Sequence, residues 1–152
     1  MSSRRPPTIL SVDDSRDEAA LLTAALRESG SECALRSVTS ADEAMAYLAG
    51  SGPYSDRRRH PQPSLILLDI QMPGQDGFAL LSWLRAQQEE WRRLPVVMLT
   101  TAHNYEEIRR AYDLGANSFL VKPTEFGELA AMLAQLVGYW LRYNEALGGP
   151  PR

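Results

Sequence analysis

Four consecutive apolar residues, Leu65-Ile66-Leu67-Leu68, constrain the fold of this chain more than any other segment. A strand with one face in water alternates apolar and polar side chains, so a short run that is apolar at every position indicates a strand buried on both faces. Strands of this kind occur in parallel sheets that helices cover on both sides. The segment therefore predicts an α/β fold.

Short apolar segments and helical patterns alternate along the rest of the chain. Four further segments are expected to be strands: Thr8–Val12, Cys33–Val38, Val96–Leu99 and Ser118–Val121. Five segments, given with their expected capping residues, have the apolar spacing of helices: Ser15–Gly30, Ser40–Gly50, Phe78–Gln88, Glu106–Gly115 and Thr124–Leu147. Five strands alternating with five helices predict an open, doubly wound, five-stranded parallel sheet.

Length and composition indicate one soluble globular domain. The chain has 152 residues, of which 44% are hydrophobic and 23% charged, and its net charge of −3 gives no attraction to nucleic acid. The single cysteine, Cys33, excludes an internal disulfide and fits a reducing compartment. No apolar run approaches the roughly 20 residues that span a bilayer. We therefore expect a cytoplasmic protein that binds neither nucleic acid nor membrane.

Polar side chains stand where four of the predicted strands end. In chain order they are Asp13 and Asp14, Asp69, Thr100, and Lys122. In open α/β sheets, ligands bind outside the carboxyl ends of the strands. We therefore expect three carboxylates, one hydroxyl and one ammonium to converge in a single crevice.

Three neighbouring carboxylates repel one another, and a divalent cation relieves that repulsion. Oxygen ligands without His or Cys select a hard ion, Mg²⁺ or Mn²⁺. Such a cation beside a lysine and a threonine suits a phosphoryl group. Asp69 would then be the nucleophile and form an aspartyl-phosphate. Thr100 and Lys122 would bind phosphoryl oxygens.

Lys122 is the only lysine among sixteen basic residues. Arginine is a planar fork that favours two acceptors, whereas lysine is a compact charge on a slim stem. A point charge suits a small pocket that holds one phosphoryl oxygen and one carboxylate oxygen. We therefore expect Lys122 to fill a role that arginine cannot.

Four motifs in order carry a resemblance to a known family: Val12-Asp13-Asp14, Leu68–Gly77, Met98–Ala102 and Phe119–Pro123. Over about residues 8–138 the chain resembles the receiver domain of bacterial two-component response regulators, which have a flavodoxin-like fold. The resemblance implies that Asp69 is the phospho-acceptor. It implies direct metal ligation by Asp14, Asp69 and the backbone carbonyl of Gln71, with Asp13 acting through metal-bound water. Thr100 and Phe119 match the family's switch pair.

The function implied is that of a single-domain response regulator, not an enzyme, although slow autodephosphorylation is expected. A sensor histidine kinase would phosphorylate Asp69, and the surface of the helix 106–114, the strand 118–121 and the last helix would signal to an unknown downstream protein. The domain is expected to span 8–147, with a flexible segment at 1–7 and a tail at 148–152. Leu99–Asn104 and Tyr139-Trp140-Leu141 are similar to stand-alone regulators paired with phytochrome-type kinases, several of which are dimeric.

The last predicted helix is apolar on two sides, which indicates burial on both. One stripe is expected to face the sheet: Phe126, Leu129, Leu133, Val137 and Trp140. Tyrosine, tryptophan and methionine are also enriched at interfaces. We therefore predict a homodimer through Met132, Leu136, Tyr139, Trp140 and Tyr143.

Other interpretations remain open at this point. The domain could be a phosphorelay intermediate or a phosphate sink, or a scaffold that works without phosphorylation. An aspartate-nucleophile phosphatase would need an acid two residues after Asp69, where this chain has Gln71.

Several polar residues outside the crevice have simpler interpretations. Asp76 and Gly77 are interpreted as a turn into a helix, and His60 and His103 as surface residues without a metal. The run Arg57-Arg58-Arg59 is interpreted as a solvated loop.

Overall fold

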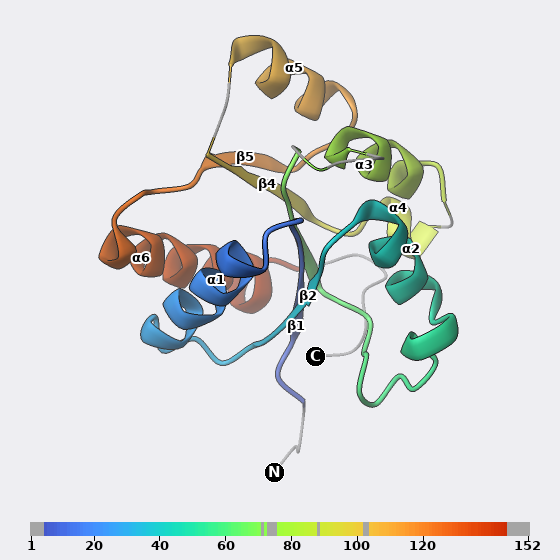
Figure 1. Ribbon diagram of the computed structural model, residues 1–152, viewed down its shortest axis with the longest axis horizontal. Helices are drawn as coiled ribbons and strands as arrows, with labels where there is room; N and C mark the ends of the chain where they lie inside the picture. The colour runs from blue at the N-terminus through green and yellow to red at the C-terminus, as the bar shows by residue number, and fades with distance from the viewer. Residues whose placement is uncertain (1–4, 71, 73–75, 88, 102–103, 146–152) are drawn as a thin grey trace.

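The computed structural model describes residues 5–70, 72, 76–87, 89–101 and 104–145. Its core is one parallel sheet with the strand order β2-β1-β3-β4-β5 (Figure 1). The strands are β1 (Thr8–Val12), β2 (Ala34–Val38), β3 (Leu65–Leu68), β4 (Val96–Thr100) and β5 (Ser118–Val121). The doubly wound five-stranded sheet is therefore confirmed, with β3 in its centre.

Helices cover both faces of the sheet. They are α1 (Arg16–Glu28), α2 (Ala41–Ala49), α3 (Gly77–Arg85), α4 (Glu89–Arg92), α5 (Tyr105–Asp113) and α6 (Phe126–Val137). A 3₁₀ turn, η1 (Gly52–Tyr54), follows α2, and a π-helical segment, η2 (Gly138–Tyr143), continues α6. In Figure 1, α1 and α6 lie together on one side of the sheet, and α2 and α3 lie on the other.

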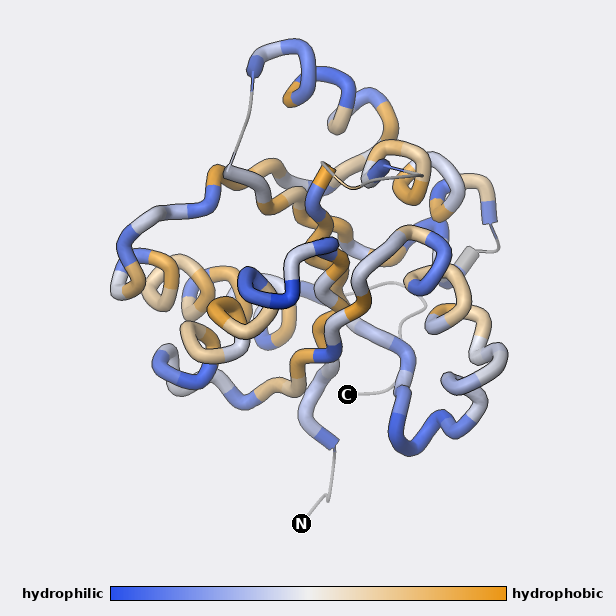
Figure 2. Tube along the Cα trace, viewed as in Figure 1, coloured by the Kyte–Doolittle hydropathy of each residue, from blue (hydrophilic) through white to orange (hydrophobic). Residues whose placement is uncertain are grey.

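The apolar run of β3 supplies both cores. Ile66 and Leu68 belong to the cluster under α2 and α3, whereas Leu65 and Leu67 belong to the cluster under α1 and α6. Successive side chains of a strand point to opposite faces, so each half of the run fills one core. Figure 2 shows the strands as predominantly hydrophobic and α5 as predominantly hydrophilic.

Helix capping agrees with the sequence at the first two helices and differs at the last. The hydroxyls of Ser15 and Ser40 accept the backbone N–H groups of Glu18 and Glu43, as expected of N-caps. The last helix is capped by Glu125 and not by Thr124. Its two carboxylate oxygens accept the backbone N–H groups of Gly127 and Glu128, both at 2.9 Å.

The predicted end of the last helix, near Leu147, is also wrong. Helical structure ends at Tyr143, and Asn144 is extended, with its N–H donating to the carbonyl of Tyr139. Leu147 itself, and the predicted tail at 148–152, lie outside the described residues. So do residues 1–4 of the predicted N-terminal segment.

The expected helix Phe78–Gln88 is shorter and is followed by a sixth helix that the sequence did not predict. Helix α3 ends at Arg85, and α4 is a single turn. The guanidinium of Arg85 donates to the carbonyls of Gly115 and Leu94 at 2.9 and 2.8 Å and to Asn117 Oδ1 at 2.9 Å. Burial lowers the pKa of Arg85. The side chain therefore links the end of α3 to the segments that directly precede β4 and β5.

The loop between 51 and 64 is anchored to α2, in contrast to the solvated run expected from its arginines. Arg57 donates to the carbonyls of Tyr47 and Leu48 at the end of α2, at 2.7 and 3.3 Å. The ring of His60 packs edge-on against Tyr47 and Tyr54, so His60 is half-buried and not a free surface residue. Only Arg58 and Arg59 of the run are exposed.

No helix among the described residues is long and apolar enough to cross a membrane.

Candidate functional site

Three aspartates meet at the carboxyl ends of β1 and β3. The two strands are neighbours with Val12 opposite Leu68, and the Asp69 N–H donates to the Val12 carbonyl at 3.0 Å. Asp13 and Asp14 follow β1 directly, and one oxygen from each of the three carboxylates lies within 4.8 Å of the others. The convergence predicted from the strand ends is therefore confirmed for Asp13, Asp14 and Asp69.

These carboxylates fit a hard divalent cation. The cluster contains oxygen ligands alone, which is the ligand set of Mg²⁺ and Mn²⁺. Both oxygens of Asp13 are already engaged, because Oδ1 accepts the Ser15 N–H at 2.9 Å and Oδ2 lies 3.5 Å from Lys122 Nζ. The expectation that Asp13 acts through metal-bound water stays a prediction. Gln71, whose carbonyl was predicted as a ligand, lies outside the described residues.

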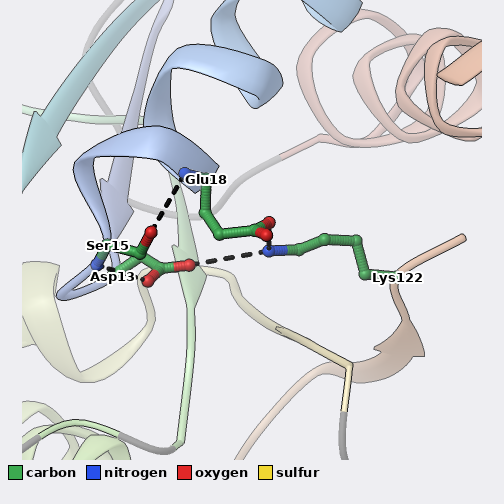
Figure 3. A network of polar contacts seen from close by, with 4 residues as sticks. All are labelled: Asp13, Ser15, Glu18 and Lys122. Carbon is green, nitrogen blue, oxygen red and sulfur yellow. Dashed lines mark hydrogen bonds and ion pairs between the residues drawn. The ribbon is translucent and has the colours of Figure 1, made fainter. Parts of the chain in front are cut away.

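Lys122 is buried beside the carboxylates and has two acidic partners. Its side chain is 8% exposed, and its Nζ lies 2.8 Å from Glu18 Oε2 and 3.5 Å from Asp13 Oδ2 (Figure 3). Its backbone N–H donates to the Thr100 carbonyl at 2.9 Å, which aligns the ends of β4 and β5. The site thus brings the predicted lysine to the predicted carboxylates.

Glu18 is a site residue that the sequence interpretation missed. It stands three residues after the N-cap Ser15, a spacing typical of a capping box, in which the glutamate would accept the N-cap N–H. In this protein the Ser15 N–H donates to Asp13 Oδ1, and the Glu18 carboxylate accepts from Lys122 instead. A glutamate in the first turn of the helix that follows two site aspartates is the signal that could have found it.

Thr100 and Phe119 lie on adjacent strands and on the same face of the sheet. Phe119 is opposite Met98 in the β4–β5 register, and Thr100 is two residues beyond Met98. Thr100 is 2% exposed, whereas Phe119 is half-buried and packs against the core under α2 and α3. The two side chains are therefore diagonal neighbours.

A small pocket joins the charged groups. Asp13, Glu18, Asp69 and Lys122 line it together with the apolar side chains of Leu22, Leu67 and Leu99. The pocket thus combines charged and apolar lining residues, and apolar surroundings strengthen electrostatic interactions.

Residues 9–134 match the family described as the response regulator receiver domain. This chain belongs to that family. Response regulator receiver domains are signalling domains of two-component systems, and their general function is to accept a phosphoryl group. The predicted family is therefore confirmed over most of the chain.

The receiver domain is similar along nearly its full length to three named regulators. It is 34% identical to response regulator Rcp1 of Synechocystis sp. over 91% of this chain and 92% of Rcp1. The Mn²⁺-bound form of Rcp1 superposes with a TM-score of 0.78 at 32% identity, covering 94% and 100% of the two chains.

Two further relatives come from light signalling. The phosphorylated cyanobacterial phytochrome response regulator RcpA has a TM-score of 0.81 at 30% identity, over 93% of this chain and 98% of RcpA. The response regulator RPA3017 in red light signalling of R. palustris has a TM-score of 0.86 at 29% identity, over 94% and 99%. The resemblance to phytochrome-associated regulators that the sequence indicated is therefore confirmed.

The residues predicted for a dimer interface are only partly accessible in the receiver domain. Leu136 is 6% exposed and belongs to the core under α1 and α6, so it is not part of a free surface. Met132 and Trp140 are half-buried against that core, whereas Tyr139 and Tyr143 are 59% and 72% exposed.

The stripe expected to face the sheet is mostly confirmed. Leu129, Leu133 and Val137 are buried in the core under α1 and α6. Phe126, at the first position of α6, is 39% exposed, so its expected contact with the sheet is wrong. The first turn of α6 extends beyond the edge of the core.

Proposed function

We propose that this receiver domain accepts a phosphoryl group on Asp69 from a phosphohistidine of a sensor histidine kinase. The observation that carries the proposal is the convergence of Asp13, Asp14 and Asp69 within 4.8 Å, next to a buried lysine. Asp69 follows the central strand and lines the same pocket as Lys122. A carboxylate in this setting has both the nucleophilic oxygen and the neighbouring cation that phosphoryl transfer requires.

The transfer is a substitution at phosphorus. A carboxylate oxygen of Asp69 forms a P–O bond while the P–N bond to the donor histidine breaks. The imidazole, protonated on its other ring nitrogen, leaves as a neutral ring. The ammonium of Lys122 and the hydroxyl of Thr100 donate to oxygens of the transferred group.

Asp13, Asp14 and Asp69, with the carbonyl of Gln71, would hold Mg²⁺ or Mn²⁺. A bound divalent cation supplies positive charge against the negative charge on the phosphoryl oxygens. The Ser15 N–H holds Asp13 in the orientation that keeps its second oxygen towards Lys122.

The output is a change in the surface formed by α5, β5 and α6. Thr100 moves towards a phosphoryl oxygen, and the ring of Phe119 turns into the space that this leaves. The diagonal placement of these residues on one face of β4 and β5 supports this coupling. A local electrostatic event is thereby converted into a change of packing.

The donor is a phytochrome-type histidine kinase. The similarity to RcpA and RPA3017, each over more than nine-tenths of this chain, supports this choice. Transfer from a purified phytochrome-type kinase that is faster than from an unrelated histidine kinase is the expected result, and equal rates would contradict it.

The domain forms a homodimer through α6 and η2. Tyr139 and Tyr143 leave two exposed aromatic rings beside the half-buried Trp140, a composition typical of interfaces. Light scattering at tens of micromolar should give a dimer for the wild type and a monomer for Tyr139→Ser combined with Tyr143→Ser. A monomer in both phosphorylation states would overturn this assembly.

Phosphorylation of the full chain with a small donor, phosphoramidate, tests the function. With Mg²⁺, the wild type should gain the mass of one phosphoryl group, and Asp69→Asn should gain none. Asp17→Asn, which changes an exposed aspartate of α1, should behave like the wild type. An equal mass gain in Asp69→Asn would contradict the assignment.

A further inference from the structure

Glu18 is the closer of two carboxylates that hold the only lysine of the chain. The distance from Lys122 Nζ to Glu18 Oε2 is 2.8 Å, and the distance to Asp13 Oδ2 is 3.5 Å (Figure 3). The lysine comes from the end of β5 and the glutamate from the first turn of α1, 104 residues away in sequence. The ammonium is therefore already bound before a phosphoryl group arrives.

The same pocket contains the proposed nucleophile. Asp69, Asp13, Glu18 and Lys122 all line it. At neutral pH an aspartyl-phosphate at position 69 carries between one and two negative charges on its phosphoryl oxygens, in place of the single charge of the Asp69 carboxylate. The new charge attracts Lys122 and repels the Glu18 carboxylate.

The two partners of Lys122 differ in how easily they can release it. The Asp13 side chain is 10% exposed and is held from its other oxygen by the Ser15 N–H. The Glu18 side chain is 38% exposed, so its carboxylate can regain water when it lets go. An ion pair with a partly exposed carboxylate contributes little to stability, so breaking it costs little free energy.

We propose that Glu18 is a positioning residue that competes with the phosphoryl group for Lys122. The proposal rests on the proposed function of Asp69. In the unmodified protein Glu18 holds the ammonium towards α1. On phosphorylation Lys122 exchanges Glu18 for a phosphoryl oxygen, and Glu18 turns to solvent. Glu18 thereby lowers the affinity of the site for the phosphoryl group without blocking it.

Binding of beryllofluoride, a phosphoryl analogue, to the full chain with Mg²⁺ tests this competition. Glu18→Gln should bind about three- to fivefold more tightly than the wild type, as expected for the loss of one partly exposed ion pair. The matched control Asp17→Asn removes the same charge from the same helical turn and should stay within about twofold of the wild type. In a Lys122→Ala background, Glu18→Gln should give no gain.

A second readout uses the single lysine and needs no phosphoryl analogue. Protein labelled with ¹³C-lysine gives one set of lysine side-chain signals, which belongs to Lys122. Without beryllofluoride, Glu18→Gln should shift the Cε signal, and Asp17→Asn should leave it in place. If Glu18 only stabilised the start of α1, its substitution would leave the Lys122 signal in place. A shifted Cε signal therefore shows that Glu18 positions Lys122.

The outcomes distinguish the two proposals. Failure of the wild type to bind beryllofluoride would overturn the phosphoryl function and the competition together. If the wild type binds beryllofluoride, any of four results would overturn the competition alone. Glu18→Gln could bind no more tightly than the wild type, or Asp17→Asn could gain as much affinity as Glu18→Gln. The gain in affinity from Glu18→Gln could also persist in the Lys122→Ala background, or the Lys122 Cε signal could stay unmoved in Glu18→Gln.

Discussion

A Cβ atom on Gly77 would lie 2.3 Å from the backbone carbonyl oxygen of Asp69. It would also lie 2.9 Å from the Cα of Ile70, so two backbone segments meet at this glycine. Helix α3 therefore begins close to Asp69 and Ile70. Asp76, the residue before Gly77, is the N-cap of α3, and its carboxylate accepts the Ala79 N–H. The position of Asp69, the proposed phospho-acceptor, therefore depends on a residue that carries no side chain.

Gly77→Ala should destabilise the protein by about 1–3 kcal/mol, because the added methyl group would collide with the backbone of Asp69 and Ile70, which no rotamer change relieves. Urea denaturation measures this loss. Gly138→Ala is the control, since nothing lies within 4 Å of a Cβ at that position. The control should be neutral or more stable by up to about 1 kcal/mol. Equal stability of Gly77→Ala and the wild type would show that the backbone moves freely here.

Lys122→Arg should weaken beryllofluoride binding by about tenfold or more, although the charge is kept. The lysine side chain is 8% exposed between Asp13 and Glu18, and a planar guanidinium would pair with both carboxylates and stay there. Titration by NMR measures the affinity, and a melting curve checks that the variant is folded. Wild-type affinity in Lys122→Arg would mean that the single lysine has no special role.

The ring of Phe119 should become more buried when beryllofluoride binds. Protein labelled with fluorophenylalanine gives three ¹⁹F signals, one for each phenylalanine. The difference in shift between H₂O and D₂O reports exposure, and Phe78 at 5% and Phe126 at 39% exposed calibrate it. Phe119→Leu assigns the signal. An unchanged solvent shift for Phe119 would remove the ring from the switch.

Tyr54 and Glu43 should make stability depend on pH at both extremes. Burial, followed by the hydrogen bond to Glu43 and the charge of Glu43, raises the pKa of Tyr54 to about 12. Since the unfolded value is about 10, this contribution is complete below pH 10 and is lost as the pH rises through about 12. Burial raises the pKa of Glu43, but hydrogen bonds from the Thr39 N–H, Tyr54 and the Thr39 hydroxyl outweigh it and lower the pKa overall. That contribution is present above the unfolded pKa of Glu43 and is lost as the pH falls through the folded one.

Tyr54→Phe should therefore lose about 1 kcal/mol at pH 7, and the difference from the wild type should shrink as the pH rises from about 10 to about 12. Urea denaturation across pH and ¹³C-tyrosine NMR check both statements. The exposed Tyr105 provides the control Tyr105→Phe, which should match the wild type. A Tyr54 that titrates near pH 10 would contradict the contact with Glu43.

The sheet and its acidic cluster were predictable because their signals are local. Burial of β3 on both faces is visible in four consecutive residues, and the ends of parallel strands share one edge of a sheet. Asp13, Asp14 and Asp69 could thus be brought together from strand ends alone. The N-caps Ser15 and Ser40 are likewise local, because each capping hydroxyl and the backbone N–H that donates to it lie within one turn.

The errors concern contacts between distant segments. Glu18 turns to Lys122 only because Asp13 takes the Ser15 N–H, which no periodicity reveals. Helix α4 is one turn long, too short to give a helical repeat. Arg57 donates to the carbonyls at the end of α2, and Leu136 is buried in the core under α1 and α6. Composition alone therefore predicted the wrong environment for both residues.

Mapping the phosphorylated residue tests most directly whether Asp69 accepts the phosphoryl group. Borohydride reduces an aspartyl-phosphate to homoserine, which peptide mass spectrometry locates in the chain. After treatment of the wild type with phosphoramidate and Mg²⁺, homoserine is expected at position 69 and at no other aspartate. Homoserine at position 13 or 14, or an absence of homoserine in protein that has gained a phosphoryl group, would contradict the assignment of Asp69.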